Sequence, residues 1–554
     1  MSKIVIYQIF TRLFGNRNTT RNENGTIAEN GCGKFADFNA KTLKIFRDMG
    51  ITHVWYTGVI RHASKTNYTA YGIPAQHHAV VKGNAGSPYA ITDYYDVDPD
   101  LASDVDKRMS EFEALVKRTH NAGLKMIIDF VPNHVARQYK SVCKPKGVAD
   151  LGENDNVDEG FSPQNNFYYC PGCSFEPYID KQATERYVYT EIPAKATGND
   201  HFDNHPGMND WYETVKLNYG VDYWTHIGHF DPIPDTWLKM TDILMFWAAK
   251  GIDGVRCDMA EMVPAAFWAY ATAKVKEQYP DFIFIGEVYN PAEYRNYIHS
   301  GVDYLYDKVG MYDTLRAVTC HQCGAQAITG SWMATDDIGR HMLYFLENHD
   351  EQRIASDFFA GNGCKGVPAM IVSVLMNTNP FMLYFGEEFG ERGMDKEGFS
   401  GRDGRTTIFD YWSVDTICRA SWDALSDEEK YLKAIHSKVL NIANNEDAVC
   451  NGRFYDLMYA NPWSEKFDAN RIYTFLRRSD TELILVVANF DDCNKDVSVK
   501  IPAHAFDFLG IMEKTAKATD LLSGKTVAVE LKKDCCIEVS VAARGAAVLK
   551  LTNV

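Results

Sequence analysis

The chain has 554 residues, enough for more than one domain, and a formal net charge of −17 at pH 7. An acidic chain repels nucleic-acid phosphates, so we expect no nucleic-acid partner. No apolar run approaches the ~20 residues that span a bilayer, so we also expect no membrane partner. These features leave the oligomeric state open.

The first predicted element is an apolar strand at residues 4–10, which follows three N-terminal residues directly. No secretory signal stands before this strand. We therefore expect a cytoplasmic protein, or an exported one, secreted or periplasmic, whose signal peptide has been removed.

Eight apolar segments in total are predicted strands, and most gaps between them carry a helical period, as at residues 38–49 and 104–122. Alternating strands and helices predict an α/β fold with a parallel sheet, and eight such units predict a closed (β/α)8 barrel of the TIM type. The predicted strands are residues 4–10, 52–57, 125–130, 254–257, 282–287, 302–306, 342–346 and 381–385.

One gap between predicted strands is too long for a single helix. Residues 135–220, after the third strand, are rich in Gly, Asn, Asp, Pro and Tyr. We interpret this stretch as a small inserted domain on the face of the barrel that carries the active site. The barrel would then consist of residues 1–134 and 221–450.

The C-terminal part of the chain changes character after a last predicted helix at residues 427–443. From residue 451 it shows short alternating strands, among them residues 472–476, 483–488 and 545–551. Such strands predict a separate antiparallel β-sandwich domain at residues 451–554.

The thirteen cysteines are odd in number and scattered, which favours a reducing compartment over a disulfide scaffold. Two Cys-x-x-Cys pairs stand out, Cys170 with Cys173 and Cys320 with Cys323. One pair alone cannot complete a tetrahedral zinc site. Free thiols are the simpler interpretation, and a small metal or disulfide clip that includes Cys143 is the alternative.

Charged and polar side chains close four of the predicted strands. In a parallel barrel the active site is assembled from the C-terminal ends of the strands, so we expect these side chains to lie together. They are Asp129, Asn133 and His134 after the third strand, Arg256 and Asp258 after the fourth, Glu287 after the fifth, and His349 and Asp350 after the seventh.

Arg256 and Asp258 are two residues apart at the end of one strand, so their side chains share a face. We expect the guanidinium to keep the pKa of Asp258 low and its carboxylate ionised. An ionised carboxylate suits a nucleophile better than a general acid. The alternative is a buried salt bridge without a catalytic role.

Four short motifs follow the third, fourth, fifth and seventh strands. They are DFVPNH at 129–134, GVRCD at 254–258, GEV at 286–288 and NHD at 348–350. Each is weak alone, whereas all four in this order are specific. With supporting segments at 6–10, 89–95 and 216–218, the chain resembles the α-amylase superfamily of retaining glycoside hydrolases over nearly its whole length.

The resemblance implies three acidic catalytic residues. It makes Asp258 the nucleophile, Glu287 the general acid/base and Asp350 the carboxylate that holds and distorts the sugar. Retention requires two carboxyl groups ~5–5.5 Å apart, one ionised and one protonated. Because Glu287 would face both aspartates, like charge and burial would raise its pKa toward that of an acid catalyst.

The resemblance also implies residues that bind the substrate. His134 and His349 would bind sugar hydroxyls, Tyr89 would stack on the same sugar, and Arg256 would orient the nucleophile. Asp129 matches a structural aspartate that is often paired with that arginine.

The sequence departs from the family pattern just after Asp258. Many starch-cleaving members have Lys-His where this chain has Glu261 and Met262. Glu261 is therefore a candidate contact on the acceptor side of the bond that is cut. The departure leaves the identity of the glucan and the mode of cleavage open.

A structural calcium ion is implied by the same resemblance. Ca²⁺ often ties the inserted domain to the barrel in this family, and it prefers oxygen ligands. The predicted ligands are Asn133, Asp203 and Asp210, with a backbone carbonyl near Met262. Solvated loop carboxylates are the alternative for the two aspartates.

The predicted function is hydrolysis of α-1,4-glucosidic bonds in starch-like glucans or maltooligosaccharides, with retention through a covalent glycosyl-enzyme. An α-glucan or oligosaccharide is the expected partner. The alternatives are an exo-acting α-glucosidase or a glucanotransferase with the same three acids. A further alternative is a non-catalytic relative that only binds glycans.

Overall fold

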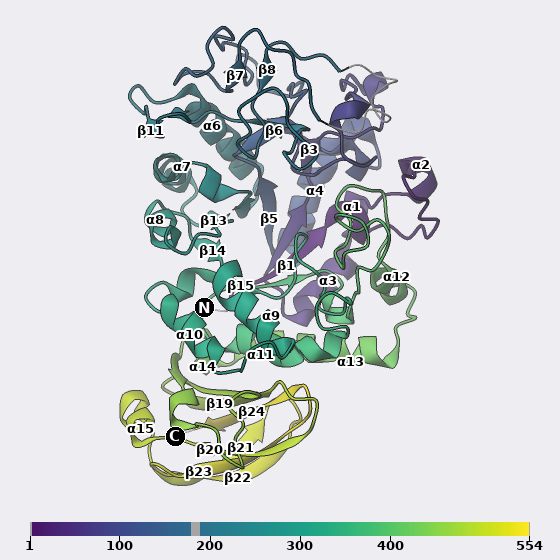
Figure 1. Ribbon diagram of the computed structural model, residues 1–554. Helices are drawn as coiled ribbons and strands as arrows, with labels where there is room; N and C mark the ends of the chain where they lie inside the picture. The colour runs from purple at the N-terminus through teal and green to yellow at the C-terminus, as the bar shows by residue number, and fades with distance from the viewer. Residues whose placement is uncertain (1–2, 179–188, 553–554) are drawn as a thin grey trace.

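The computed structural model describes residues 3–178 and 189–552. A closed barrel of parallel strands occupies the middle of the molecule, with an irregular region at one end and a β domain at the other (Figure 1). No helix in these residues is long and apolar enough to cross a membrane.

Eight parallel strands close the barrel, and each lies inside its predicted range, so the predicted TIM-type barrel is confirmed. Its inner core contains side chains from alternate positions of the strands, such as Ile6, Trp55, Ile127 and Leu343. In order around the barrel, the strands are β1 (Val5–Phe10), β2 (His53–Thr57), β5 (Lys125–Phe130), β12 (Gly254–Cys257), β13 (Ile283–Gly286), β14 (Tyr304–Tyr306), β15 (Met342–Phe345) and β16 (Phe381–Tyr384).

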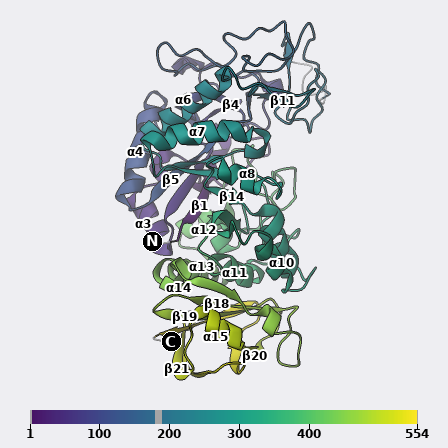
Figure 2. The ribbon, with the colours of Figure 1, turned by 90° about the vertical axis from the view of Figure 1, so that its left-hand side faces the viewer.

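Helices surround the barrel and bury apolar stripes against the outer faces of the strands (Figure 2). The sequence marks their ends: the Asn39 side chain accepts hydrogen bonds from the first turn of α3, and Gly50 ends that helix at φ 99°. The main helices are α3 (Ala40–Met49), α4 (Arg108–Asn121), α6 (Asp235–Ala249), α7 (Ala265–Gln278), α8 (Tyr294–His299), α9 (Asp313–Thr319), α10 (Ala327–Ala334), α11 (Val367–Leu375) and α13 (Asp427–Asn445).

Between β5 and α6 the chain leaves the barrel and covers the C-terminal ends of the strands (Figure 1). This stretch has little regular structure. Its short antiparallel pairs are β6 (His134–Ala136) with β9 (Thr214–Lys216), β7 (Tyr169–Cys170) with β8 (Ala194–Lys195), and β10 (Val221–Asp222) with β11 (Ile227–Gly228).

The C-terminal β domain packs on the opposite end of the barrel, where α11 contacts β19 and β24 (Figure 2). It has a six-stranded antiparallel sheet and a second, two-stranded antiparallel sheet. In order, the larger sheet contains β17 (Arg453–Asp456), β18 (Ile472–Arg478), β19 (Glu482–Asn489), β24 (Gly545–Thr552), β21 (Lys514–Asp520) and β22 (Thr526–Leu531), and the smaller contains β20 (Lys495–Lys500) and β23 (Cys536–Val541).

All thirteen cysteines are free thiols, including both Cys-x-x-Cys pairs. Cys143 accepts a hydrogen bond from Arg108 and lies beside Asp93 and Asp96, not beside the first Cys-x-x-Cys pair. These two aspartates are already paired with arginines. The disulfide clip is therefore absent, and the metal clip stays a prediction.

Candidate active site

Asp258 and Glu287 stand side by side at the C-terminal ends of neighbouring strands. Cys257 in β12 is aligned with Gly286 in β13, and the two acids are the next residues in each strand. Neighbouring strands lie about 4.8 Å apart. Strand register alone therefore brings these carboxyl groups close to the separation that a retaining glycosidase needs.

The Arg256 guanidinium contacts both acids, one through each of its Nη atoms. It is fully buried, and its Nη1 lies 2.7 Å from Asp258 Oδ1 while its Nη2 lies 2.7 Å from Glu287 Oε2. Asp129 Oδ1 is 3.7 Å from the same Nη1. One positive charge is thus shared among three carboxyl groups.

This sharing overturns the predicted low pKa of Asp258. Burial raises the pKa of Asp258 well above its ordinary value, and Glu287 and Asp350 add to the rise, while Arg256 opposes it. The sequence showed the nearest guanidinium but not the other acids that compete for it.

Asp350 follows β15 and meets the other two acids in one cavity. Its Oδ2 lies 3.0 Å from Nε2 of the buried His349. Burial acts against ionisation, but His349, with Arg256 farther away, lowers the pKa of Asp350 below its ordinary value. Asp350 therefore stays ionised more readily than Asp258.

Tyr89 and His349 form one wall beside Asp350. Their rings stack with centroids 5.2 Å apart, and Tyr89 Oη lies 2.6 Å from His349 Nε2. Gln8 Nε2 lies 2.8 Å from His349 Nδ1, which places this histidine between fixed partners on both ring nitrogens. Both rings are held in place before any ligand binds.

His134 lies across the cavity, at the start of β6, and its ring faces Trp211 at 5.4 Å between centroids. Burial, and then the nearby Lys216 ammonium, lower the pKa of His134 to about 3. His134 is therefore neutral at physiological pH and can both donate and accept a hydrogen bond.

The other predicted binding residues do not reach the cavity surface. Arg256 and Asp129 lie behind the acids, and Asp129 accepts a hydrogen bond from Trp55 Nε1 at 3.2 Å. Glu261 Oε2 instead accepts from the backbone N–H groups of Tyr289 and Asn290 at 2.8 and 3.0 Å. The Glu261 carboxylate thus fixes the loop after β13, and its role as a contact on the acceptor side stays a prediction.

Tyr289 is a site residue that the sequence analysis missed. Its hydroxyl donates to Glu287 Oε1 at 2.5 Å, and Met259 N donates to Glu287 Oε2 at 2.7 Å. Met259 adopts a φ of 45°, in the left-handed region that residues other than glycine rarely occupy. Tyr289 is two residues beyond Glu287, so the period-2 argument used for Arg256 and Asp258 could have found it.

The cavity has a volume of about 390 Å³, within the range of small-ligand sites. Part of its wall comes from the inserted segment and part from the loops after β16. No local motif marks the residues of these two regions, because only the fold brings them to the acids. The lining residues that the sequence did not indicate are Lys82, Ser87, Trp211, Glu213, Thr214, Met259, Tyr289, Phe399, Ile408 and Phe409.

Groups of the protein itself occupy the oxygens that are predicted to bind calcium. Asp203 Oδ1 accepts from His205 N at 2.7 Å and Asp210 Oδ2 from Gly207 N at 2.7 Å. Asn133 Oδ1 accepts from the Lys216 ammonium at 2.5 Å. A calcium ion takes six to eight oxygen ligands at about 2.3–2.6 Å, so an ammonium on Asn133 does not fit this predicted site.

The chain matches the family model "Alpha amylase, catalytic domain" over residues 8–449. It is 22% identical to Alpha-amylase 3 of Dictyoglomus thermophilum, over 95% of this chain and 93% of that protein. It is 23% identical to a cyclomaltodextrin glucanotransferase of Geobacillus stearothermophilus, over 69% of this chain and 49% of that protein.

A solved structure, the maltogenic α-amylase AmyB of Thermotoga neapolitana, superposes with a TM-score of 0.63 at 18% identity, covering 100% of this chain and 99% of that one. This likeness supports the fold. Because the family model spans the whole barrel, from β1 to the last barrel helix, the chain belongs to the α-amylase family of glycoside hydrolases and is an enzyme.

Proposed function

We propose that the enzyme hydrolyses α-1,4-glucosidic bonds in starch-like glucans or maltooligosaccharides with retention of configuration. The observation that carries this proposal is the pair Asp258 and Glu287, held on one guanidinium and open to a cavity that also contains Asp350. Retention through two successive inversions requires one carboxyl group that attacks the sugar and a second that protonates the leaving oxygen. The side-by-side placement of Asp258 and Glu287 supports these two roles.

In the proposed first step, an Asp258 oxygen attacks the anomeric carbon while the bond to the leaving oxygen breaks. Glu287 gives its proton to that oxygen, which leaves as a hydroxyl group. The product is a glycosyl ester of Asp258. In the second step, a water molecule attacks the same carbon, Glu287 takes its proton, and Asp258 is released as a carboxylate.

The other cavity residues support the same chemistry. Positive charge develops on the sugar in the transition state, and the ionised Asp350 lies where it can stabilise that charge. Tyr89 offers a ring face for the sugar, and the neutral His134 can bond its hydroxyls. His349, through its Nε2, holds Tyr89 and Asp350 in position. Arg256 holds the acids in place, and the guanidinium stays charged because its own pKa is well above neutrality.

Product analysis tests the proposal. Starch, pullulan, maltooligosaccharides and a blocked chromogenic maltooligosaccharide are incubated with the enzyme, and the anomers released are followed by NMR. We expect α-anomers first and cleavage of the blocked substrate. Cleavage of unblocked chain ends alone would indicate an exo-acting α-glucosidase, and larger or cyclic products would indicate a glucanotransferase.

Replacement of the proposed nucleophile is the sharper test. We expect Asp258→Asn to reduce kcat by at least about 10⁴-fold, since the amide cannot form the glycosyl ester. Asp242→Asn, at an exposed position on α6, is the matched control and should retain wild-type turnover. Substantial activity in Asp258→Asn, or no activity of the wild type on any α-glucan, would contradict the proposal.

A further inference from the structure

The Lys216 ammonium joins three parts of the molecule at one point. Its Nζ donates to Asn133 Oδ1 at 2.5 Å, to the Met262 carbonyl at 3.4 Å, and lies 2.7 Å from Asp200 Oδ1. Asn133 follows β5, Asp200 belongs to the inserted segment, and Met262 lies in the turn after Asp258. The three N–H groups of the ammonium thus face three oxygens.

Lys216 is buried, and strand pairing fixes its position. Its side chain is 8% exposed, and β9, which carries it, is aligned with β6 so that Lys216 is opposite His134. Asn133 is fully buried, and its Nδ2 donates to Gly198 O at 2.7 Å, which orients its Oδ1 toward the ammonium. Asn133 thus links the barrel end to the inserted segment twice.

We propose that Lys216 serves as a built-in cation that ties the inserted segment to the barrel, so that the enzyme needs no calcium ion at this point. An ammonium and a Ca²⁺ compete for the same oxygens, and a covalently attached cation cannot be lost to a chelator. The same charge helps to keep His134 neutral and fixes the turn that begins just after Asp258.

Thermal unfolding with and without metal tests this proposal and does not depend on catalysis. The apparent Tm of the wild type is measured after EDTA treatment and again with added CaCl₂. We expect the same Tm in both. A Tm that falls in EDTA and returns with CaCl₂ would overturn the proposal.

Two substitutions sharpen the test. Lys216→Met keeps the length of the side chain but removes the charge, and we expect a loss of roughly 5 °C or more in Tm, because Asp200 and Asn133 lose their partner. Lys216→Asp replaces the ammonium by a carboxylate that could bind Ca²⁺ together with the neighbouring oxygens. We expect CaCl₂ to raise the Tm of this variant.

Lys239 provides the control. It is another mostly buried lysine at the inserted segment, bonded to Asp150 O, Asn166 Oδ1 and Asp235 Oδ2 at 2.8–2.9 Å. Lys239→Asp should show no calcium response that exceeds that of the wild type. An unchanged Tm in Lys216→Met would contradict the proposed role of the ammonium, whatever the enzyme is found to hydrolyse.

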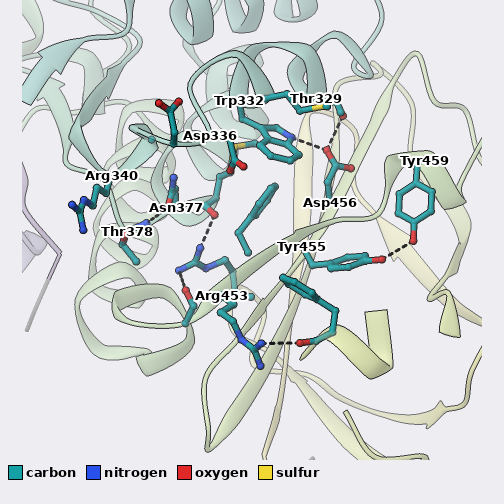
Figure 3. A pocket seen from close by; sticks show the side chains of 18 of the residues that line it. Thr329, Trp332, Asp336, Arg340, Asn377, Thr378, Arg453, Tyr455, Asp456 and Tyr459 are labelled. Carbon is teal, nitrogen blue, oxygen red and sulfur yellow. Dashed lines mark hydrogen bonds between the residues drawn. The ribbon is translucent and has the colours of Figure 1, made fainter. Parts of the chain in front are cut away.

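A different observation, a large cavity, carries a second inference. A cavity of about 1210 Å³ lies between the barrel and the C-terminal β domain, bounded by α10, by the loops before β15 and β16, and by β17 and α15 (Figure 3). Those loops meet the N-terminal ends of the barrel strands. The cavity is therefore at the opposite end of the barrel from Asp258 and Glu287.

Aromatic rings in this cavity are fixed by hydrogen bonds. Trp332 Nε1 donates to Asp456 Oδ2 at 2.8 Å, and Tyr455 Oη lies 2.6 Å from both Tyr459 Oη and His504 Nδ1. Figure 3 shows Trp332 beside Asp456 and the Tyr455 hydroxyl turned toward Tyr459. Tyr459 itself is 64% exposed, so its ring is available to a ligand.

The charges around the cavity cancel. Its lining includes the aspartates 336, 337 and 456 and the arginines 340, 453 and 477. A balanced set of donors and acceptors around aromatic faces suits an uncharged ligand with many hydroxyl groups, and it disfavours phosphorylated or strongly acidic ligands. The volume exceeds the ~300–1,000 Å³ of ordinary small-ligand sites, which favours an extended molecule.

We infer that this cavity binds a second stretch of the glucan chain, away from the bond that is cut. This inference rests on the proposed function for the identity of the ligand. The fixed rings would stack on sugar faces, while Arg453 and Asp336 would bond hydroxyl groups. The enzyme would then hold a polymer at both ends of the barrel.

Affinity electrophoresis in native gels that contain amylopectin tests the inference. In the Asp258→Asn background, which prevents digestion of the gel, Tyr459→Ala combined with Arg453→Ala should weaken retardation roughly threefold to tenfold. Tyr431→Ala, at an exposed tyrosine of α13 outside the cavity, is the control and should migrate like its parent. Retardation equal to that of the control would overturn the inference.

Kinetics separate this inference from the proposed function. In an otherwise wild-type enzyme, the paired Tyr459 and Arg453 variants should lower kcat/KM on starch and leave a short chromogenic maltoside unaffected. If no α-glucan is hydrolysed but retardation still depends on Tyr459, the proposed function fails and the binding site stands. An equal loss on both substrates would contradict a separate site.

Discussion

At the residue scale, one guanidinium contacts several acids of the site. Arg256 contacts Asp258 and Glu287 at equal distances, so neither acid has it alone. The Tyr289 hydroxyl donates a hydrogen bond to Glu287 Oε1, whereas Arg256 contacts Glu287 Oε2. The hydrogen bonds that hold Glu287 thus come from donors that lie outside the four sequence motifs.

Removal of the Tyr289 hydroxyl tests the contribution of its hydrogen bond with Glu287 to catalysis. Tyr289→Phe should reduce kcat by roughly 10- to 100-fold, because a hydrogen bond to a carboxylate contributes about 1.5–3 kcal/mol. A wild-type kcat with reduced stability would assign Tyr289 to packing alone. Tyr431→Phe is the control.

Glu388 gives a prediction about stability and pH. Burial raises the pKa of Glu388 to about 7, against 4.5 for an ordinary glutamate. The folded state therefore binds the proton more tightly than the unfolded state, and stability is lost as pH rises from about 4.5 to 7. Each pKa unit corresponds to about 1.4 kcal/mol, so the full loss is about 3 kcal/mol.

The variant Glu388→Gln cannot ionise. Between pH 5 and pH 8 the free energy of unfolding of the wild type should fall by about 2.5 kcal/mol relative to that of Glu388→Gln, whatever constant offset the amide introduces. Chemical denaturation at the two pH values measures this difference. A difference between variant and wild type that is independent of pH would show that Glu388 does not titrate in this range.

At the element scale, strand register sets the distance between the reacting acids. Gly254 at the start of β12 has no side chain, and a Cβ there would lie 2.6 Å from the Ile283 carbonyl oxygen and 2.4 Å from Ile283 Cγ1 in β13. The absence of a side chain lets β12 and β13 approach closely. Asp258 and Glu287 follow these two strands, so their spacing depends on this contact.

Gly254→Ala should therefore destabilise the enzyme by about 1–3 kcal/mol and also lower kcat, because the clash pushes β12 and β13 apart. Gly330→Ala is the control, since a Cβ in that turn of α10 meets nothing within 4 Å. It should be neutral or stabilising, as alanine favours helices. Urea unfolding and turnover, measured on both variants, separate the two effects. Equal behaviour of the variants would contradict the argument.

The sequence predicted the elements better than it predicted the site. All eight barrel strands could be read from apolar runs, because strands buried on both faces are uniformly apolar. Asp258 and Glu287 could be placed because each ends such a run. Trp211 and Phe409 could not, because they lie in irregular segments that only the closed barrel brings to the acids.

At the scale of the whole molecule, Arg477 ties the C-terminal β domain to the barrel. This buried residue of β18 donates to the carbonyls of Met376, Ala448, Val449 and Gly452 at 2.8–3.0 Å. Met376 ends a barrel helix, and the other carbonyls precede β17. Burial lowers the pKa of Arg477 to about 9, so the guanidinium stays charged at neutral pH.

Arg477→Met should cost at least about 3 kcal/mol, because three buried carbonyls and a partly buried one lose their donor. We expect the barrel and the β domain of this variant to unfold in separate transitions. Fluorescence and far-UV circular dichroism during denaturation would then no longer coincide. Arg340→Met, at an exposed position, is the control. One coincident transition at wild-type stability would rule out this role.

The sequence by itself determined the barrel, the β domain and the three acids, because these depend on local patterns of apolar runs ended by charged groups. Only the tertiary structure decided the protonation of Asp258, the place of Glu261 and the partner of Asn133. Each of these depends on charges that are distant in the chain but close in space. The local sequence indicates which charged residue is nearest along the chain. Folding decides how many further charged residues contact the same group.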